Sequence, residues 1–226
     1  MAAATTDRRN REPTNRRLVW GLLLGYSLLW IWLAIEPVNR RDWLLENLLA
    51  LTGVAVLILT YRRFRFSNVS YCLIALFLTL HAIGAHYTYA EVPFGFWLKD
   101  AFALSRNPFD RLVHFSFGLL LVYPMRELLV RLAHVRGFWS YYLPASAILA
   151  QSGFFEVIEA IVAMVVSPEL GTLYLGTQGD EWDAQKDMTA AFTGALLTLS
   201  ATRWLPSSTR LIRLSLGGNP LQAFPK

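Results

Sequence analysis

Four carboxylates crowd the stretch QGDEWDAQKDM, residues 178–188, immediately before the last apolar run of the chain. Asp183 and Asp187 are four residues apart, a spacing that places two side chains on one face of a helix. A solvated loop accounts for Glu181, and the helix dipole stabilises one acid in a first turn by about 0.3–1 kcal/mol. Neither explains two aligned acids beside an apolar segment, so we interpret the stretch as one edge of a polar site.

Two further pairs repeat the helical spacing. Asp110 and His114 are four residues apart in NPFDRLVHFSFG, and Glu156 and Glu159 are three apart in SGFFEVIEAIVAMVV. A carboxylate that faces lipid at mid-helix costs about 2.5–3.5 kcal/mol on insertion scales. The two glutamates lie within an apolar run, and they must therefore face the interior of a helical bundle. There they need a partner, which is Arg111, a histidine, a shared proton or a metal.

These residue types suit acid–base chemistry or metal binding. Imidazole and carboxylate ligands without a thiol are typical of Zn, Mn or non-haem Fe, and helical bundles build such sites from inward Glu and His on facing helices. The candidate catalytic residues are Glu156, Glu159, Asp110 and Arg111; the candidate metal ligands are His81, His86, His114, Asp183 and Asp187; and the candidate substrate-binding residues are Asp180, Trp182, Tyr87 and Tyr89.

Three observations weigh against parts of this assignment. His81 and His86 are five residues apart, which puts them on different sides of a regular helix, and no established ligand motif is present. The histidines and acids alternatively hydrogen-bond one another and only tie the helices together. Trp182 stands between two aspartates, where anchoring the loop at the membrane interface is a commoner role than stacking on a substrate.

The composition indicates which elements must position these residues. Of 226 residues 54% are hydrophobic and only 16% are charged, against about 25% charged in a soluble domain. Six runs approach the length of about 20 residues that a membrane-spanning helix needs: 18–35, 44–61, 69–87, 112–131, 141–166 and 188–205. The first run exceeds a signal-peptide core and lacks a small-x-small cleavage site, so it is interpreted as a retained anchor. The chain is therefore predicted to be an all-α polytopic membrane protein, a six-helix transmembrane bundle.

The basic residues predict the orientation of this bundle. Alternate assignment of the loops places 15 Lys and Arg on one side of the membrane and six on the other, and the basic side stays in the cytoplasm. Both termini are thus predicted to be cytoplasmic, with a basic tail at 1–17, the transmembrane domain at 18–205 and a second tail at 206–226. The candidate site residues then lie at the periplasmic end. The connection EVPFGFWLKDAFALSRNPFD is expected to fold over this end, with GFWLKDAFAL as an interfacial helix.

Other features limit the possible functions and suggest how the helices pack. The net charge of +5 comes from basic residues that flank apolar runs and form no surface stripe, which argues against nucleic acid. A single cysteine, Cys72, excludes an intramolecular disulfide and a cysteine-based zinc site. Gly118, and Gly194 beside Ala190 and Ala191, permit close contact between two helices.

Several strings together are similar to a known family. HAIGAHYTYAEVPFG, RNPFDRLVHFSFGLLLVYP, FFEVIEA and LGTQGDEWDAQKDM resemble the YjdF family of bacterial inner-membrane proteins, over roughly residues 18–205. The resemblance implies a multi-pass protein of the inner membrane. The family is uncharacterised, so no activity, cofactor or catalytic residue comes with the resemblance.

Three functions compete on this basis. The first is a metal-dependent hydrolase or transferase that acts on a lipid or a lipid-linked envelope substrate. The second is a proton-coupled transporter, whose relays use intramembrane acids and histidines; the chain shows no internal repeat of the kind common in transporters. The third is a metal-free hydrolase, or a non-catalytic ligand-binding or envelope-maintenance protein, in which a carboxylate pair shares one proton. The expected partner is the lipid bilayer, and the oligomeric state stays open.

Overall fold

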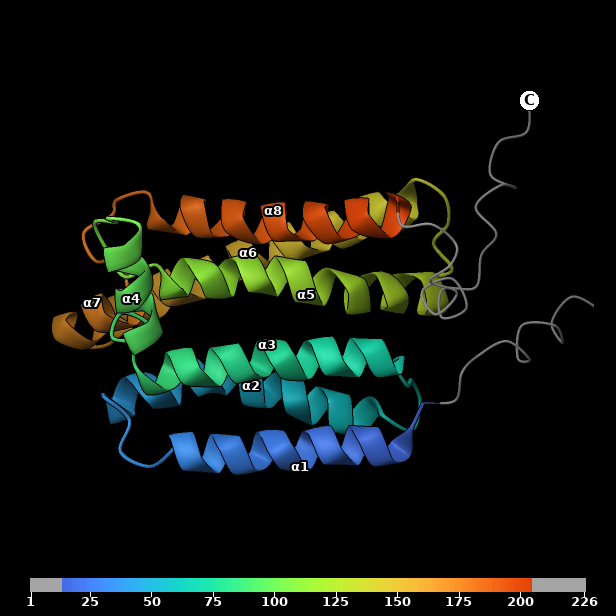
Figure 1. Cartoon of the computed structure of the whole chain (residues 1–226), viewed down its shortest axis with the longest axis horizontal. Helices are drawn as coiled ribbons and strands as arrows, with labels where there is room; N and C mark the ends of the chain where they lie inside the picture. Colours follow the sequence, from blue (N-terminus) through green and yellow to red (C-terminus); the bar gives the residue numbers. More distant parts are fainter. Residues whose placement is uncertain (1–13, 205–226) are drawn as a thin grey trace, which may run out of the picture.

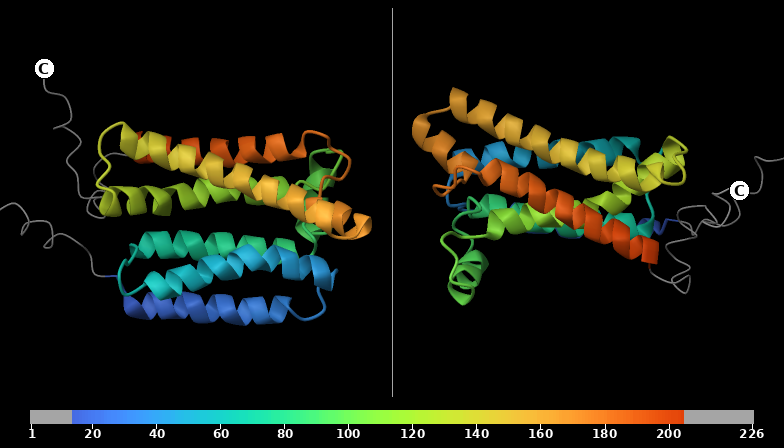
Figure 2. Two further views of the ribbon diagram at one scale, coloured as in Figure 1. Left: turned by 180° about the vertical axis from the view of Figure 1, so that it is seen from behind. Right: turned by 90° about the horizontal axis from the view of Figure 1, so that it is seen from above.

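The computed structural model describes residues 14–204, and this part of the chain is helical without a strand. Its helices are α1 (Arg16–Leu33), α2 (Arg40–Thr60), α3 (Asn68–His86), α4 (Pro93–Ala101), α5 (Phe109–Leu132), α6 (Trp139–Val165), α7 (Pro168–Leu175) and α8 (Asp183–Trp204). The long helices α1, α2, α3, α5, α6 and α8 run side by side along the molecule, and the short α4 and α7 both lie at one end, on opposite sides of the bundle (Figures 1 and 2). Of the two predicted tails, residues 1–13 and 206–226 lie outside the described residues.

Four of the described helices are long and apolar enough to cross a membrane, namely α2, α3, α5 and α6. The helix α1 begins with two arginines, and α8 carries Asp183, Lys186 and Asp187 in its first turns. The all-α, polytopic architecture predicted from the sequence is confirmed. Membrane crossing by α1 and α8 stays a prediction, and in α8 the charged residues are those of the candidate site.

Capping residues explain where the first three helices begin. The side chain of Asn15 accepts hydrogen bonds from the backbone of Arg17 and Leu18, and that of Asn39 accepts from Arg41 and Asp42. Ser67 caps α3 in the same way. Each cap satisfies backbone N–H groups that a helix start leaves without a partner, which is why Asn and Ser are favoured there.

The helices pack in two groups. α5, α6 and α8 enclose an apolar core of Val122, Ala145, Ile148, Ala191, Ala195 and Leu199, whereas α1, α2 and α3 pack around Tyr26, Leu33 and Ala82. The groups meet where α3 packs against α5, for example through the rings of Phe77 and Phe117, whose centroids are 5.5 Å apart. The segment predicted to be interfacial, between the third and fourth apolar runs, contains α4. This helix lies at the left-hand end of the bundle in Figure 1.

The closest packing joins α5 to α8. A Cβ atom built on Gly118 would overlap the backbone oxygen of Ala191, and one on Gly194 would overlap that of Phe115. The hydroxyl of Thr198 donates a 2.6 Å hydrogen bond across the same interface to the carbonyl of Leu119. The glycine-mediated helix contact predicted from the sequence is confirmed, and it sets the distance between the two helices that carry Asp110, His114, Asp183 and Asp187.

We predict that Gly194→Ala lowers the free energy of unfolding by about 1–3 kcal/mol, because overpacking forces the two backbones apart. The matched control is Gly53→Ala on α2, where an added Cβ meets nothing within 4 Å. Unfolding in mixed detergent micelles measures both. Equal stability of the two variants would contradict the tight α5–α8 contact.

A buried carboxylate ties α3 to α5 at the end of the bundle opposite α4 and α7. Glu127 is fully buried and accepts hydrogen bonds from the backbone N–H and the hydroxyl of Ser67, both 2.8 Å long. It also accepts from the Ser70 hydroxyl and forms an ion pair with Arg131. A buried carboxylate with this many donors is a structural anchor, since its partners would lose a charged acceptor in a low-dielectric interior.

Replacing Glu127 by Ala is expected to lower the free energy of unfolding by about 3–5 kcal/mol, the usual effect of removing one partner of a buried ion pair. Glu91→Ala, at an exposed glutamate, serves as the control and should change stability by less than about 0.5 kcal/mol. The same micelle assay measures both variants. A small effect at position 127 would mean that water, not protein, solvates this carboxylate.

Candidate functional site

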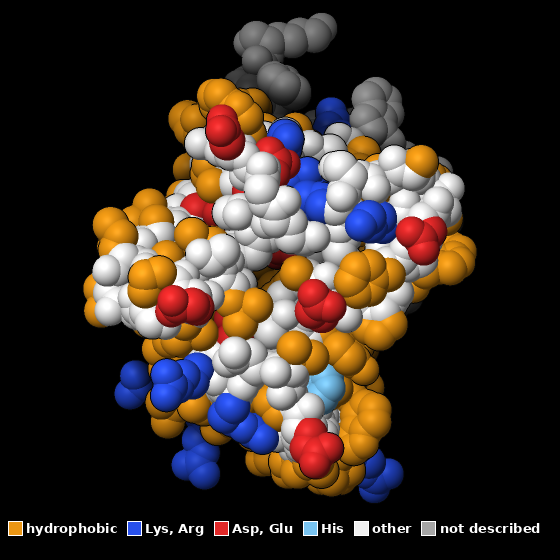
Figure 3. All heavy atoms as spheres, turned by 90° about the vertical axis from the view of Figure 1, so that its left-hand side faces the viewer, with side chains coloured by type: hydrophobic (Ala, Val, Ile, Leu, Met, Phe, Trp, Pro, Cys, Tyr) orange, Lys and Arg blue, Asp and Glu red, His pale blue; other side chains and the backbone are white. Residues whose placement is uncertain are grey.

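The site residues come together at the end of the bundle that carries α4 and α7. Asp110 and His114 lie in the first two turns of α5, Asp183 and Asp187 in the first two turns of α8, and Glu159 in the second half of α6. Figure 3 looks onto this end, where acidic and basic side chains surround recesses between the elements. The pairs Asp110 with His114 and Asp183 with Asp187 are therefore brought to the same end of the bundle.

Three of these residues form a candidate metal centre. Asp110, His114 and Asp187 each place a potential ligand atom within 4.8 Å of the other two. Nε2 of His114 lies 3.6 Å from Oδ1 of Asp110 and 3.7 Å from Oε1 of Glu156. These distances exceed those of hydrogen bonds, about 2.7–3.2 Å. They are close to the separation of about 3.4 Å between two ligands of a tetrahedral metal bound at about 2.1 Å.

Glu156 lies beside these three residues and comes from a further helix, α6. Its Oε1 is buried and has no hydrogen-bond partner among the described residues. A buried polar atom without a partner is costly, so native structures seldom contain one that neither water nor an ion satisfies. Glu156 is therefore suited to be a fourth ligand or a base beside the centre.

Two arginines surround the aspartates of α8. Asp183 forms ion pairs with both Arg106 and Arg111, the latter at 2.6 Å. Arg111 also reaches Asp187 at 3.3 Å and Asp180 at 3.4 Å. Because one oxygen of Asp183 already accepts from two guanidinium groups, this residue neutralises and orients the arginines, and it lies beside the candidate centre without joining its three ligands.

Arg106 links two loops across this end, a role that the sequence did not indicate. It donates to the carbonyl oxygens of Thr177 at 2.9 Å and Gly176 at 3.3 Å. Next to it, the backbone of Asn107 exchanges two hydrogen bonds with the side chain of Gln178. These contacts fix the loop before α8 against the loop before α5. The first turns of α5 and α8, which carry the aspartates, are therefore held next to each other.

Asp180 and Trp182 lie at the outer edge of the site. Hydrogen bonds from Lys186 lower the pKa of the Asp180 carboxyl to about 2, with Lys186 Nζ at 2.7 and 2.9 Å from its oxygens. Asp180 is therefore an anion at neutral pH and helps hold Arg111. The Trp182 side chain is 64% exposed, which fits the interfacial anchor better than a contact inside the site.

Two histidines proposed as ligands lie elsewhere. Nε2 of His81 is 3.2 Å from the carbonyl of Glu46, which can only accept, so this nitrogen carries the proton. In the neutral ring, Nδ1 then accepts from the Tyr89 hydroxyl at 2.5 Å. Burial, followed by the nearby Glu46, raises the pKa of Tyr89 well above its ordinary value, which keeps this hydroxyl protonated. Both nitrogens of His81 are thus occupied.

His86 and Tyr87 also have structural contacts. Nδ1 of His86 lies 2.7 Å from the carbonyl of Leu33 and joins α3 to the end of α1. The Tyr87 ring packs edge-on against it, with centroids 4.5 Å apart. Neither these residues nor His81 and Tyr89 belong to the group around His114, which consists of Asp110, His114, Glu156, Glu159 and Asp187.

Two acids of α2 extend the polar interior and were not among the candidates. Asp42 and Glu46 are almost fully buried, and each has one carboxyl oxygen without a hydrogen-bond partner in the described chain. Glu159 of α6 lies close enough to Glu46 and Glu156 for the charges of these carboxylates to repel one another. Asp42 and Glu46 are four residues apart, so the spacing that identified the other pairs could have found this one as well.

Spans long enough to cross a membrane and a buried polar site at one end define a multi-pass helical membrane protein. The chain belongs to the family described as "Predicted membrane protein (DUF2238)", whose family model matches residues 18–207. It is 38% identical over 177 residues to "Inner membrane protein YjdF" of Escherichia coli (strain K12), a match that covers 78% of this chain and 84% of that protein. No solved structure matches the chain. The resemblance inferred from the motifs is confirmed.

His114→Gln should abolish metal binding, because it removes the only imidazole of the candidate centre. The wild-type protein, purified in mild detergent, is expected to hold about one divalent metal per chain, as a buried three-ligand site requires. His134→Gln, at an exposed histidine, should retain the metal. Elemental analysis of the three proteins measures this, and a metal-free wild type would contradict the centre.

Proposed function

We propose that this chain is a metal-dependent hydrolase or transferase of the bacterial inner membrane that acts on a lipid or lipid-linked envelope substrate. The observation that carries the proposal is the position of His114 Nε2, with carboxylate oxygens of Asp110 and Glu156 at 3.6 and 3.7 Å and Asp187 close by. Two helices that meet through glycines hold three of these groups, so the centre is built on rigid elements.

The proposed topology has six transmembrane helices, both termini in the cytoplasm and the site near the periplasmic face. α1 and α8 extend alongside the four candidate spans (Figure 2). Exposed arginines lie at the opposite end of the bundle from the site: Arg16, Arg17, Arg62, Arg63 and Arg65. Basic residues of short loops stay in the cytoplasm, which supports a periplasmic site. The similar Escherichia coli protein is named an inner membrane protein, and we extend that location to this chain.

The donor set indicates which metals suit the centre. One imidazole with two or three carboxylates fits Zn, Mn or non-haem Fe. Such a metal would lower the pKa of a bound water to near neutral and so supply a nucleophile at neutral pH. Glu156, whose Oε1 has no partner within the described part of the chain, is the group we assign as the base beside the centre. Glu159, one turn along α6, would share a proton with it.

Arg111 is the group we assign to the substrate. It is held by three aspartates, yet 31% of its side chain stays exposed at the mouth of the site. A guanidinium presents several donors in a fixed plane and pairs with phosphate oxygens. An anionic lipid head group or a lipid-linked diphosphate would therefore contact Arg111 while its reacting bond lies over the centre.

Proton-coupled transport is the second candidate, favoured by the buried carboxyl groups that continue from Glu159 to Glu46 and Asp42. Intramembrane acids of this kind serve as proton relays. Beyond the site, however, the space between α5, α6 and α8 is filled by the apolar core around Val122 and Ile148, both fully buried. The buried polar residues next along α5 and α6 are Ser116 and Ser152, whose hydroxyl groups do not titrate. The ionisable relay therefore does not continue into this described core, which favours chemistry at one face over passage across the membrane.

Glu156→Gln is expected to abolish the activity while the protein stays folded, because the amide cannot accept the proton. Wild type and variant would be expressed in Escherichia coli that lacks the similar protein, with Glu181→Gln, an exposed loop position, as the control. Mass spectrometry of lipids and lipid-linked envelope intermediates should show one pool that wild type and Glu181→Gln change and Glu156→Gln does not. Thermal melting of the purified proteins checks that all three are folded.

Two outcomes would overturn this function. The first is an unchanged lipid and intermediate profile for all three proteins. The second is proton flux in reconstituted vesicles that Glu159→Gln abolishes and a chelator leaves intact, which would establish the transporter in its place.

A further inference from the structure

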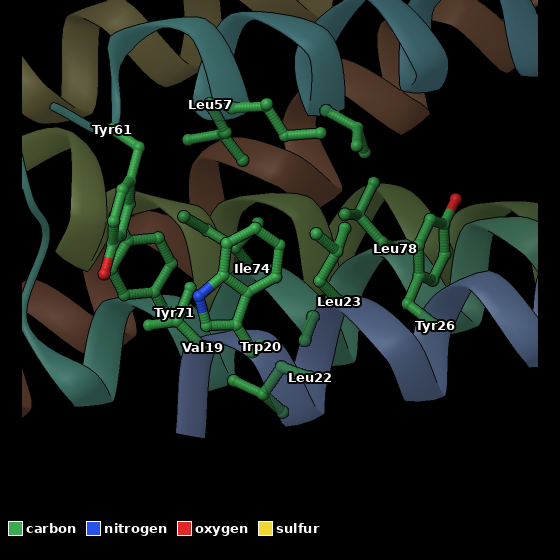
Figure 4. Close-up of a pocket in the computed structure, with 13 residues that line it drawn as sticks. Val19, Trp20, Leu22, Leu23, Tyr26, Leu57, Tyr61, Tyr71, Ile74 and Leu78 are labelled. Carbon is green, nitrogen blue, oxygen red and sulfur yellow. The ribbon is translucent and has the colours of Figure 1, made fainter. Parts of the chain in front are cut away.

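An apolar groove lies among the three N-terminal helices, far from the polar site. It has a volume of about 120 Å³ and an almost entirely apolar lining. Figure 4 shows its walls: Val19, Trp20 and Leu23 from the start of α1, Leu57 and Tyr61 from the end of α2, and Tyr71, Ile74 and Leu78 from the first half of α3. All three wall segments belong to the end of the bundle opposite α4 and α7.

An apolar lining alone cannot make the groove prefer one lipid over another, because all lipid tails are as apolar as leucine. Any selectivity must therefore come from the polar groups at its ends. Tyr61 stands at one end and Tyr26 at the other (Figure 4), and the hydroxyl of each is buried without a hydrogen-bond partner among the described residues. Of the two, Tyr61 is the one beside a basic residue, Arg65. A phenol that lines an apolar groove needs an acceptor, and the ester carbonyl of a glycerolipid supplies one at this depth.

The charge around this end is of one sign. Arg16 and Arg17 precede the α1 wall, and Arg62, Arg63 and Arg65 follow the α2 wall; all five are exposed. The guanidinium of Arg65 lies 5.2 Å from the centre of the Tyr61 ring, directly beside the groove. The sequence contains no Asp or Glu at 13–35 or 47–90, and these two stretches supply all of the lining residues and all five arginines.

We infer that the groove binds one acyl chain of an anionic phospholipid, with the lipid phosphate held by the arginines after α2. The chain would lie along α1 from Val19 to Tyr26, a length of about 10 Å at the helical rise per residue. In the proposed topology the lipid belongs to the cytoplasmic leaflet. This site is separate from the centre around His114, and it neither requires nor supports the chemistry proposed there.

Native mass spectrometry of the delipidated full-length protein tests the inference, with phosphatidylglycerol and phosphatidylcholine of identical acyl chains as the two probes. Wild type should retain phosphatidylglycerol in preference. Arg62→Gln combined with Arg63→Gln should weaken phosphatidylglycerol binding about thirtyfold, since each of the two basic residues near an anionic lipid surface is worth about 1 kcal/mol. Arg136→Gln with Arg203→Gln makes the same charge change at exposed positions outside the three wall helices, and it should leave binding unchanged.

Two further measurements place the lipid in the groove. Ala75→Phe fills the groove from α3 and should reduce retention of both lipids. A phosphatidylglycerol with a photoreactive acyl chain should label peptides from 19–26 and 71–78 in the wild-type protein, a result that does not depend on how any variant folds. His114→Gln should bind the lipid as wild type does, which separates this site from the metal centre.

Equal retention of the two lipids would overturn the inference, as would an equal loss in the Arg136→Gln, Arg203→Gln control. Labelling confined to other helices would place the lipid elsewhere. A dimer whose contact covers the groove and excludes both lipids would show that a second copy of the chain is the occupant.

Discussion

Hydrocarbon does not solvate charge, and the arrangement of this bundle depends on that constraint. Acids near the ends of α5, α6 and α8 must turn inward, where Asp183 pairs with Arg106 and Arg111. The pairing is possible only because α5 and α8 approach closely, and the approach requires the missing Cβ atoms of Gly118 and Gly194. The small residues at the contact between α5 and α8 therefore permit the ion pairs at its end.

Helical spacing was the most informative sequence signal for the site. It identified Asp110 with His114, and Asp183 with Asp187, and the structure places both pairs at one end of the bundle. The signal works because a charged side chain beside an apolar run is tolerated only when it points into the bundle. Two charged residues at helical spacing must therefore point into the bundle together. Asp42 and Glu46 obey the same rule and were overlooked, since they lie at the start of a helix, where acids are common for other reasons.

The contacts of His81 with Tyr89 and of Arg106 with the carbonyls of Gly176 and Thr177 could not be predicted, because these partners lie in loops whose geometry the sequence does not encode locally. Tyr89 reaches His81 from a turn in which Thr88 and Tyr89 both have positive φ, 50° and 52°. Such values are unfavourable for residues other than glycine, and above all for a β-branched threonine. Gly84 leaves the room that the Tyr89 ring occupies. Only the assembled fold shows that this histidine is a structural link and His114 a candidate ligand.

The two ends of the bundle treat buried carboxylates differently, and the difference bears on function. Glu127 accepts hydrogen bonds from Ser67 and Ser70 and pairs with Arg131, so it has every partner that a structural anion needs. Glu156 has an oxygen without a partner in the described chain and lies 3.7 Å from an imidazole. A protein that needed Glu156 only for stability would gain by giving it donors, as it does for Glu127. Leaving such a group incomplete costs stability, and that cost is typical of sites that bind or transform a ligand.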